Sequence, residues 1–139
     1  LRLDEFMQSN KIHKIDLIKI DTEGYEFPVV MGAEQTIVSQ RPIVQLEMVE
    51  GQPERFGFSC QQIYDWFLSR DFVITLSDGT DVGNRWEHYT KKMERFFIHK
   101  SLLNDEYIKE VAIKKTKTIP SSEEKKLKEQ IAPIMIAPI

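Results

Sequence analysis

The sequence has a single cysteine, Cys60, among its 139 residues, so it can form neither an internal disulfide nor a thiolate metal site. It has no apolar run near the roughly 20 residues that a helix needs to cross a bilayer, and no basic-then-apolar leader opens it. It also has no excess of positive charge, because 19 basic residues face 22 acidic ones. We therefore expect a cytoplasmic protein that binds neither nucleic acid nor a membrane.

Glycine is scarce as well, with 6 residues, and no glycine-rich phosphate loop, P-loop lysine motif or zinc spacing occurs. What remains is an ordinary globular composition, 41% hydrophobic and 29% charged. A domain of this length buries about two-thirds of its unfolded surface, so a core can form without metal or disulfides. The chain begins with Leu1 rather than methionine, and we expect it to be part of a longer protein.

The hydrophobic pattern predicts strands and helices in alternation after a short helical segment at residues 3–7. One helix is expected from about Glu26 to Ser39, and another after Ser59, where Gln62 completes a capping-box pattern. A further amphipathic helix is expected over residues 101–115. Strands are expected at four places, residues 15–20, 43–48, 72–76 and 95–100.

This order of elements predicts an α/β fold, a layered sheet of parallel strands with right-handed crossovers and helices on its faces. The first strand is almost wholly apolar, which is typical of a strand covered by helices on both faces. The last two strands have no obvious helix between them, so we expect them to pair antiparallel. Residues 1–118 are expected to form this domain, and residues 119–139 a charged and then apolar tail that contains prolines.

Acidic side chains follow the first two strands at the points where they end. Asp21 and Glu23 follow the first strand, and Glu47 and Glu50 lie at the end of the second. Ligands of open parallel sheets bind beyond the carboxyl ends of the strands, so we expect these four carboxylates at one edge of the sheet. Acids in such places also cap helices or lie in solvated loops, and the pattern alone leaves both interpretations open.

Lys19 is the unusual residue of the first strand. In an apolar strand covered on both faces, an unpaired ammonium is costly, so we expect an acidic partner such as Asp21 or Glu47, with Gln45 nearby. Such a pair either orients the strand ends or presets a cofactor or a substrate hydroxyl. The spacing of the residues favours neither role.

Three further side chains are more typical of structural positions. His99 lies within an apolar strand and is expected to be a satisfied edge or core histidine. His88 is expected to be solvated, in a loop between Trp86 and Tyr89. Cys60 has no adjacent histidine or lysine, so we expect an inert thiol.

Residues 15–43 read IDLIKIDTEGYEFPVVMGAEQTIVSQRPI, and VQLEM follows. This string resembles the signature segment of the FkbM-type methyltransferases, and the preceding LDEFM fits the lead-in of that family. Thr22, often valine there, and Pro28 depart from the pattern. The resemblance covers the order of elements from residue 1 to about residue 98, and its distinctive residues are Lys19, Asp21, Glu23, Gly24, Glu26, Gly32, Ala33 and Glu47.

The resemblance implies the C-terminal half of a class I, Rossmann-like methyltransferase sheet, with strands four to seven in this chain and the seventh antiparallel. It implies S-adenosylmethionine as the cofactor and transfer of its methyl group to a hydroxyl of a sugar or polyketide-like natural product. The glycine-rich loop and the acidic ribose ligand of such enzymes are not in this sequence. We therefore expect a missing N-terminal half to hold most of the cofactor.

The same resemblance implies roles for individual residues. Asp21 is expected nearest the transferred methyl group, with Lys19 beside it and Glu23 or Glu47 as the base. Asp21, Gly24 and Tyr25 are expected to contact the cofactor. No metal is expected, although Asp21, Glu23 and Glu47 offer oxygen ligands for one. A hypothesis of another class is a non-catalytic α/β binding module that acts through its tail and the Trp86 loop.

Overall fold

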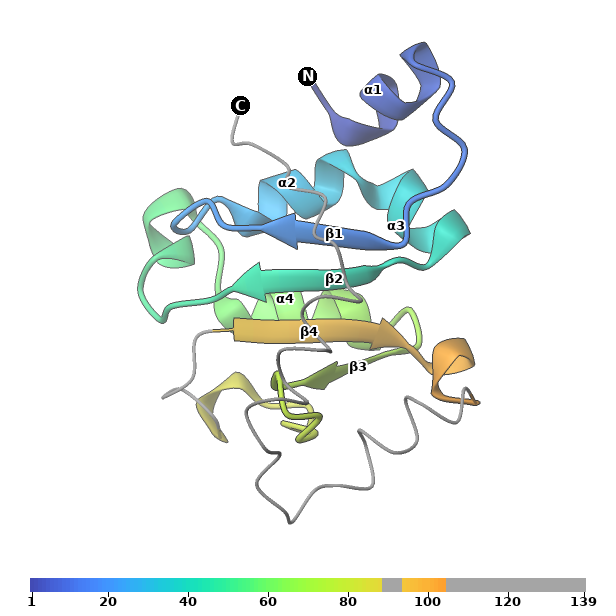
Figure 1. The fold of residues 1–139 in the computed structure, drawn as a ribbon. Coiled ribbons are helices and arrows are strands. Elements are labelled where there is room, and N and C mark those ends of the chain that lie inside the picture. The colour runs from blue at the N-terminus through green and yellow to red at the C-terminus, as the bar shows by residue number, and fades with distance from the viewer. Residues whose placement is uncertain (89–93, 105–139) are drawn as a thin grey trace.

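A computed structural model describes residues 1–88 and 94–104 (Figure 1). All four predicted strands are present, close to their predicted ends. The tail and most of the predicted helix at 101–115 lie outside the described residues. The strands are β1 (Leu17–Ile20), β2 (Ile43–Glu47), β3 (Phe72–Thr75) and β4 (Glu94–His99). The helices are α1 (Leu3–Ser9), α2 (Glu26–Gly32), α3 (Glu34–Gln40) and α4 (Cys60–Leu68), with short 3₁₀ helices η1 (Pro53–Phe56), η2 (Trp86–His88) and η3 (Lys100–Asn104).

The strands form one sheet in the order β1-β2-β4-β3. β1 and β2 are parallel, and β4 is antiparallel to both of its neighbours, β2 and β3. Three strands therefore run in one direction, and β4, the last of the described strands, lies between two of them in the opposite direction. The predicted antiparallel pairing of the last two strands is confirmed.

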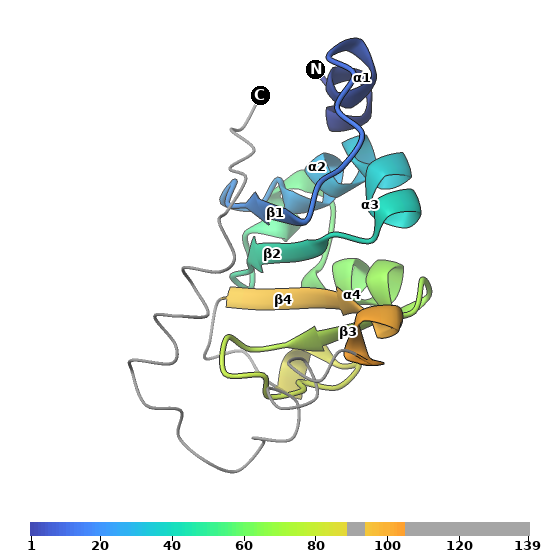
Figure 2. The same ribbon diagram turned by 45° about the vertical axis from the view of Figure 1, so that its right-hand side comes forward.

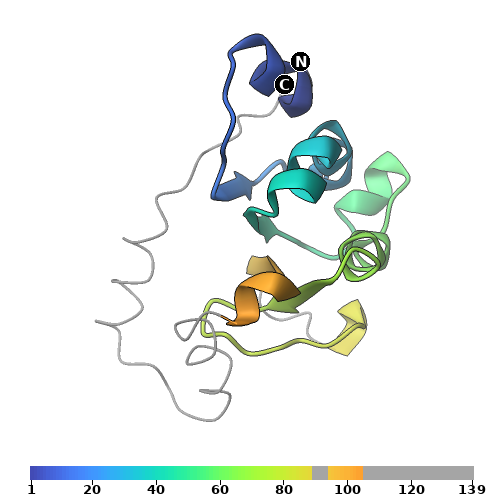
Figure 3. The same cartoon turned by 90° about the vertical axis from the view of Figure 1, so that its right-hand side faces the viewer.

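The described helices α2, α3 and α4 all lie on one side of the sheet (Figures 2 and 3). The strand residues that face them, such as Ile18, Leu46 and Phe97, are completely buried. On the other face, Lys19, Gln45 and Glu47 are only partly buried. Within the described residues the expectation of helices on both faces is therefore wrong, and β2 alternates buried and half-buried residues as a strand with one covered face does.

The single helix predicted from Glu26 to Ser39 is two helices, α2 and α3, separated at Ala33. A carboxylate from outside the segment caps the second helix. Asp4 of α1 accepts hydrogen bonds from the backbone N–H groups of Gln35 and Thr36, at 3.0 and 2.9 Å. A side-chain oxygen at that position satisfies the free N–H groups of a new helix N-terminus, so the break is stabilised by a tertiary contact.

The predicted start of α4 is confirmed in detail. The Ser59 hydroxyl accepts a hydrogen bond from the Gln62 backbone N–H at 3.1 Å, and the Gln62 side chain accepts one from the Ser59 N–H at 2.8 Å. The helix buries its predicted inward residues Ile63, Trp66 and Phe67. In the described part of the chain, no helix has both the length and the apolar character of a membrane span.

Candidate active site

β1 and β2 end at the same edge of the sheet, where their arrowheads lie side by side (Figure 1). The turn at residues 21–25 follows β1 there, and the loop at residues 48–52, continuing into η1, follows β2. This is the edge at which the sequence predicts a site. The position of each predicted residue follows from how these two connections are held.

Glu26, the first residue of α2, organises the turn after β1. Its side chain is buried, with 1% exposure, and its Oε1 atom accepts three hydrogen bonds. The donors are the Thr22 backbone N–H at 3.1 Å, the Thr22 hydroxyl at 3.0 Å and the Gly24 backbone N–H at 3.1 Å. The sequence marks Glu26 as a helix start and as part of the family resemblance but does not reveal this contact, although an acid in the first turn of a helix behind a Thr-x-Gly turn is a recognisable signal for it.

Gly24 lies where the turn packs against the loop after β2. Its φ of +113° is a conformation that side-chain-bearing residues rarely adopt. A Cβ atom here would lie 2.5 Å from the backbone oxygen of Gln52. Close packing therefore accounts for the glycine, and its contact with a cofactor stays a prediction.

Asp21 and Glu47 lie together at the ends of β1 and β2. Their carboxyl groups share a hydrogen bond, which raises the pKa of Glu47 above its ordinary value. Partial burial and the negative charges of Asp21 and Glu94 raise this pKa further, while the positive charge of Lys19 lowers it. A carboxyl group with a raised pKa accepts a proton more readily than an ordinary one, so Glu47 is suited to accepting or giving up a proton.

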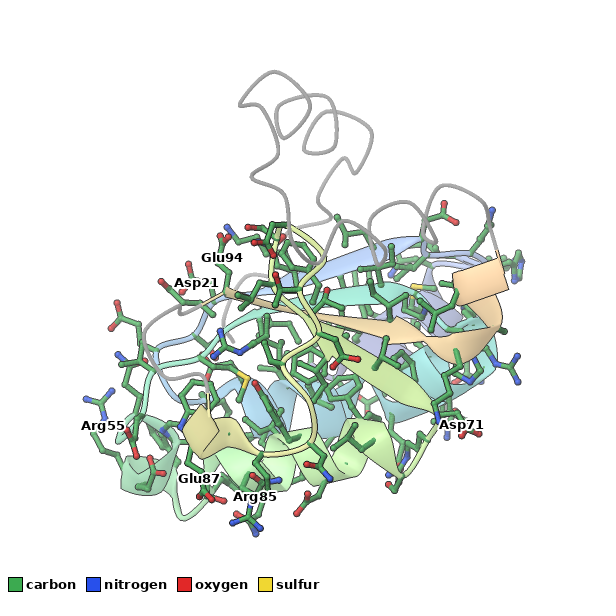
Figure 4. The ribbon with its side chains drawn as sticks, turned by 90° about the horizontal axis from the view of Figure 1, so that it is seen from below. Asp21, Arg55, Asp71, Arg85, Glu87 and Glu94 are labelled. Carbon is green, nitrogen blue, oxygen red and sulfur yellow. The ribbon has the colours of Figure 1, made fainter. Side chains whose placement is uncertain are left out.

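Glu94 is the residue at this edge that sequence analysis missed. It is the first residue of β4 and lies directly opposite Glu47 in the antiparallel register. Its carboxylate accepts a hydrogen bond from the Gln45 side-chain amide at 3.2 Å. Figure 4 shows Asp21 and Glu94 close together at one end of the sheet. Because β4 runs against β2, its beginning lies where β2 ends, and only the strand order reveals this. We call Asp21, Glu47 and Glu94 the acidic rim.

The other two predicted carboxylates lie differently. Glu23 has a φ of +54° and an exposed side chain, and its backbone carbonyl accepts a hydrogen bond from Arg55 at 2.7 Å. Glu50 is also exposed, and its charge is one of the causes that raise the pKa of Cys60. All four carboxylates follow β1 and β2 at the same edge of the sheet, as expected, but in the described residues no contact joins Glu23 or Glu50 to Glu47.

Lys19 is half-buried and reaches the acidic rim through its charge, which lowers the pKa of Glu47. The ion pairs among the described residues do not include it. The predicted close partner is not found, because one side of the strand is partly open to water and the ammonium remains partly hydrated.

Two of the three residues expected to be structural, His99 and Cys60, have such positions. The His99 ring nitrogen Nδ1 accepts a hydrogen bond from the Ser101 backbone N–H at 3.1 Å, and burial lowers the pKa of this histidine. Burial raises the pKa of the Cys60 thiol to about 12, so it stays protonated and inert. The side chain of His88 lies outside the described part.

Of the binding-module hypothesis, the described residues bear on the Trp86 side chain alone, because the tail lies outside them. This side chain is 6% exposed and packs edge-on against the Tyr64 ring. The guanidinium of Arg95 lies 4.9 Å from the centre of its indole ring. The Trp86 side chain is therefore part of the core and is not available to a partner at the surface.

The profile of a family described as the methyltransferase FkbM domain matches residues 1–74, which is more than half of the 139 residues. The match includes β1, the turn after it, β2 and α4, and it ends within β3. No curated protein and no solved structure matches the chain. Within residues 1–88 and 94–104, no group of three or more His, Cys, Asp or Glu side chains is arranged to hold a metal ion.

Proposed function

Because the chain belongs to the FkbM methyltransferase family, we propose that it is the C-terminal part of an S-adenosylmethionine-dependent O-methyltransferase domain. The family match carries the methyltransferase assignment. The identity of the cofactor, transfer to an oxygen atom and the extent of the domain are what we propose beyond that assignment. The proposed acceptor is a hydroxyl of a sugar or of another natural-product-like small molecule.

The strand arrangement supports this proposal. Three strands share one direction, and the last is inserted between them in the opposite direction. This agrees with the expected fourth to seventh strands of a class I methyltransferase sheet, of which the seventh is antiparallel. In the proposal, a preceding part of the protein supplies the remaining strands and most of the cofactor contacts.

The chemistry of the acidic rim fits such a cofactor. S-adenosylmethionine, when bound, supplies an electrophilic methyl group on a positively charged sulfur. Asp21 and Glu47 place negative charge at the carboxyl edge of the sheet, where ligands of open α/β sheets bind. Carboxylates attract a cation there, so the residues present suit the charge of the group.

The proposed catalytic role of the chain is to hold the acceptor hydroxyl and take its proton. Glu47 is the best placed base, because its raised pKa makes it a stronger proton acceptor than an ordinary glutamate. Asp21 shares the hydrogen bond with Glu47 and orients it. The nearby positive charge of Lys19 acts in the opposite direction and lowers the pKa of Glu47. Glu23 is the second candidate base, at the exposed turn.

Substitutions at the rim test the proposal in the longer protein that contains the whole domain. We expect Glu47→Gln to reduce kcat by about 10²–10⁴-fold, the usual contribution of a positioned base, with little change in the thermal midpoint. Asp21→Asn should also lower kcat. Glu23→Gln decides between the two candidate bases, and Glu50→Gln is the matched control, since Glu50 is exposed and has no contact with Glu47 among the described residues. Unchanged turnover for both Glu47→Gln and Asp21→Asn would remove the rim from the mechanism.

A further inference from the structure

The turn after β1 and the segment after β2 are joined by a set of contacts that the proposed chemistry does not itself use. The Arg55 side chain of η1 donates a hydrogen bond to the Glu23 carbonyl at 2.7 Å. The rings of Tyr25 and Phe56 meet edge to face, with centroids 5.2 Å apart. We call these four residues the turn contact.

The turn contact lies at the surface and buries little. The side chains of Tyr25 and Phe56 are 47% and 46% exposed, and Arg55 is exposed as well. Burial of apolar surface is what drives folding, so residues left this exposed contribute modestly to the stability of the whole chain. Their effect is instead local, because they tie two separate connections at one edge of the sheet.

The residue that Arg55 holds is in a strained conformation. Glu23 has a φ of +54°, which residues with a side chain seldom adopt and which persists only where surrounding contacts impose it. Glu23 lies two residues after Asp21, in the same turn. Glu26 holds Thr22 and Gly24 on the buried side of this turn, and Arg55 holds Glu23 on its exposed side, so both contacts bear on where the Asp21 carboxyl group lies.

We propose that Arg55, supported by the Tyr25–Phe56 ring pair, is a positioning residue that holds the turn after β1 so that the Asp21 carboxyl group stays beside Glu47. Figure 4 shows Arg55 at the same end of the sheet as Asp21. The catalytic relevance of this position rests on the proposed function, whereas the geometric claim can be tested without turnover. Loss of the contact lets the turn relax and moves Asp21 away from Glu47.

The charge of Arg55 and its contact with the turn have opposite consequences for Glu47, which makes the proposal testable. If Arg55 acted only as a nearby cation, its removal would raise the pKa of Glu47, because a positive charge would be lost. If it holds the turn, its removal separates Asp21 from Glu47 and weakens their hydrogen bond, which lowers that pKa. The charged groups that act on Glu47 are Asp21, Glu94 and Lys19, and these substitutions alter none of them.

The experiment is a titration of the Glu47 and Asp21 carboxyl carbons by ¹³C NMR in the full 139-residue chain. For Arg55→Ala we expect the pKa of Glu47 to fall toward its ordinary value. Arg55→Lys keeps a cationic donor and should retain most of the parent value. Arg85→Ala is the matched control, because it removes the same charge from an exposed pair with Glu87 and should leave Glu47 unchanged.

The ring pair provides a second, independent variant. Phe56→Ala should shift the pKa of Glu47 in the same direction as Arg55→Ala, and the double variant should shift it little further, because both changes release one turn. A rise or no change in the pKa of Glu47 for Arg55→Ala overturns the proposal. That result would leave the family assignment and the methyl-transfer proposal untouched, because no activity is measured.

Discussion

Glu26 and the acidic rim lie on opposite sides of the same turn. They carry the same chemical group but differ in burial and in hydrogen-bond partners. Glu26 lies on the helix-covered side, buried, with three hydrogen-bond donors converging on one oxygen. The acidic rim lies at the open side, where Asp21 and Glu47 share a hydrogen bond and Glu94 has the Gln45 amide. The comparison shows that donors, and not burial alone, decide whether a carboxylate supports the fold or is left available for chemistry.

Strand geometry produces this separation. Successive side chains of a strand point to opposite faces, so Asp21 and Thr22 leave the end of β1 in opposite directions. Thr22 meets Glu26, and Asp21 meets Glu47. One turn thus carries a structural contact with a carboxylate, at Glu26, and a candidate catalytic one, at Glu47. Substitutions on the two sides of the turn should therefore have different effects.

Glu26→Ala should have the largest effect on stability. It leaves the part-buried N–H group of Thr22 and the buried N–H group of Gly24 without an acceptor, at about 1–3 kcal/mol each. We expect the free energy of unfolding, measured by urea denaturation, to fall by about 3 kcal/mol. Glu26→Gln keeps a carbonyl oxygen and should cost clearly less. Equal losses for the two variants would contradict a role through accepted hydrogen bonds.

Gly24→Ala should come second. The added Cβ meets the Gln52 carbonyl oxygen and requires a positive φ that alanine avoids, so we expect a loss of about 2 kcal/mol. Gly57→Ala has a positive φ too but open space around the new Cβ, so it isolates the cost of conformation. If both variants lose the same stability, packing against Gln52 is not what requires Gly24.

Glu94→Gln should have the smallest effect, and it should depend on pH. Between the ordinary glutamate pKa and the raised pKa of Glu47, the folded chain binds more protons than the unfolded chain, so stability from this group falls as pH rises through that window. Removing the Glu94 charge relieves part of the repulsion that raises the pKa of Glu47. We expect the free energy of unfolding to rise by about 0.2–0.5 kcal/mol at neutral pH, and this gain to vanish in acid. Glu87→Gln, which removes a charge paired with Arg85, should show no such gain.

Chemical denaturation at several pH values checks this last effect. A gain from Glu94→Gln that stays constant down to acid pH would mean that charge repulsion at the rim is not its source. Together the three substitutions rank the contacts around the turn from the buried side to the open side.

What could be predicted from the sequence was local. The strands, the capping box of Ser59 and Gln62, and the antiparallel pairing of the last strands follow from patterns that span a few residues or one connection. The proximity of Asp21 and Glu47 could also be predicted, because two successive parallel strands end at one edge of the sheet.

What was missed depends on contacts between distant residues. The break at Ala33 is stabilised by Asp4, and the rim includes Glu94 only because β4 is inserted beside β2. The Trp86 side chain packs against Tyr64 of α4, a contact that a polar loop sequence does not reveal. Each of these required the tertiary fold.

The insertion of β4 also sets a lower limit on how far the chain can be shortened. The family match ends at residue 74, inside β3, and the sheet partner of β3 among the described strands is β4. A protein cut at that boundary would keep part of β3 but lose β4, the strand to which β3 is hydrogen-bonded. The edge of β2 that pairs with β4 would then have unpaired backbone groups. A workable minimal version has to extend to His99, well past the region by which the family is recognised.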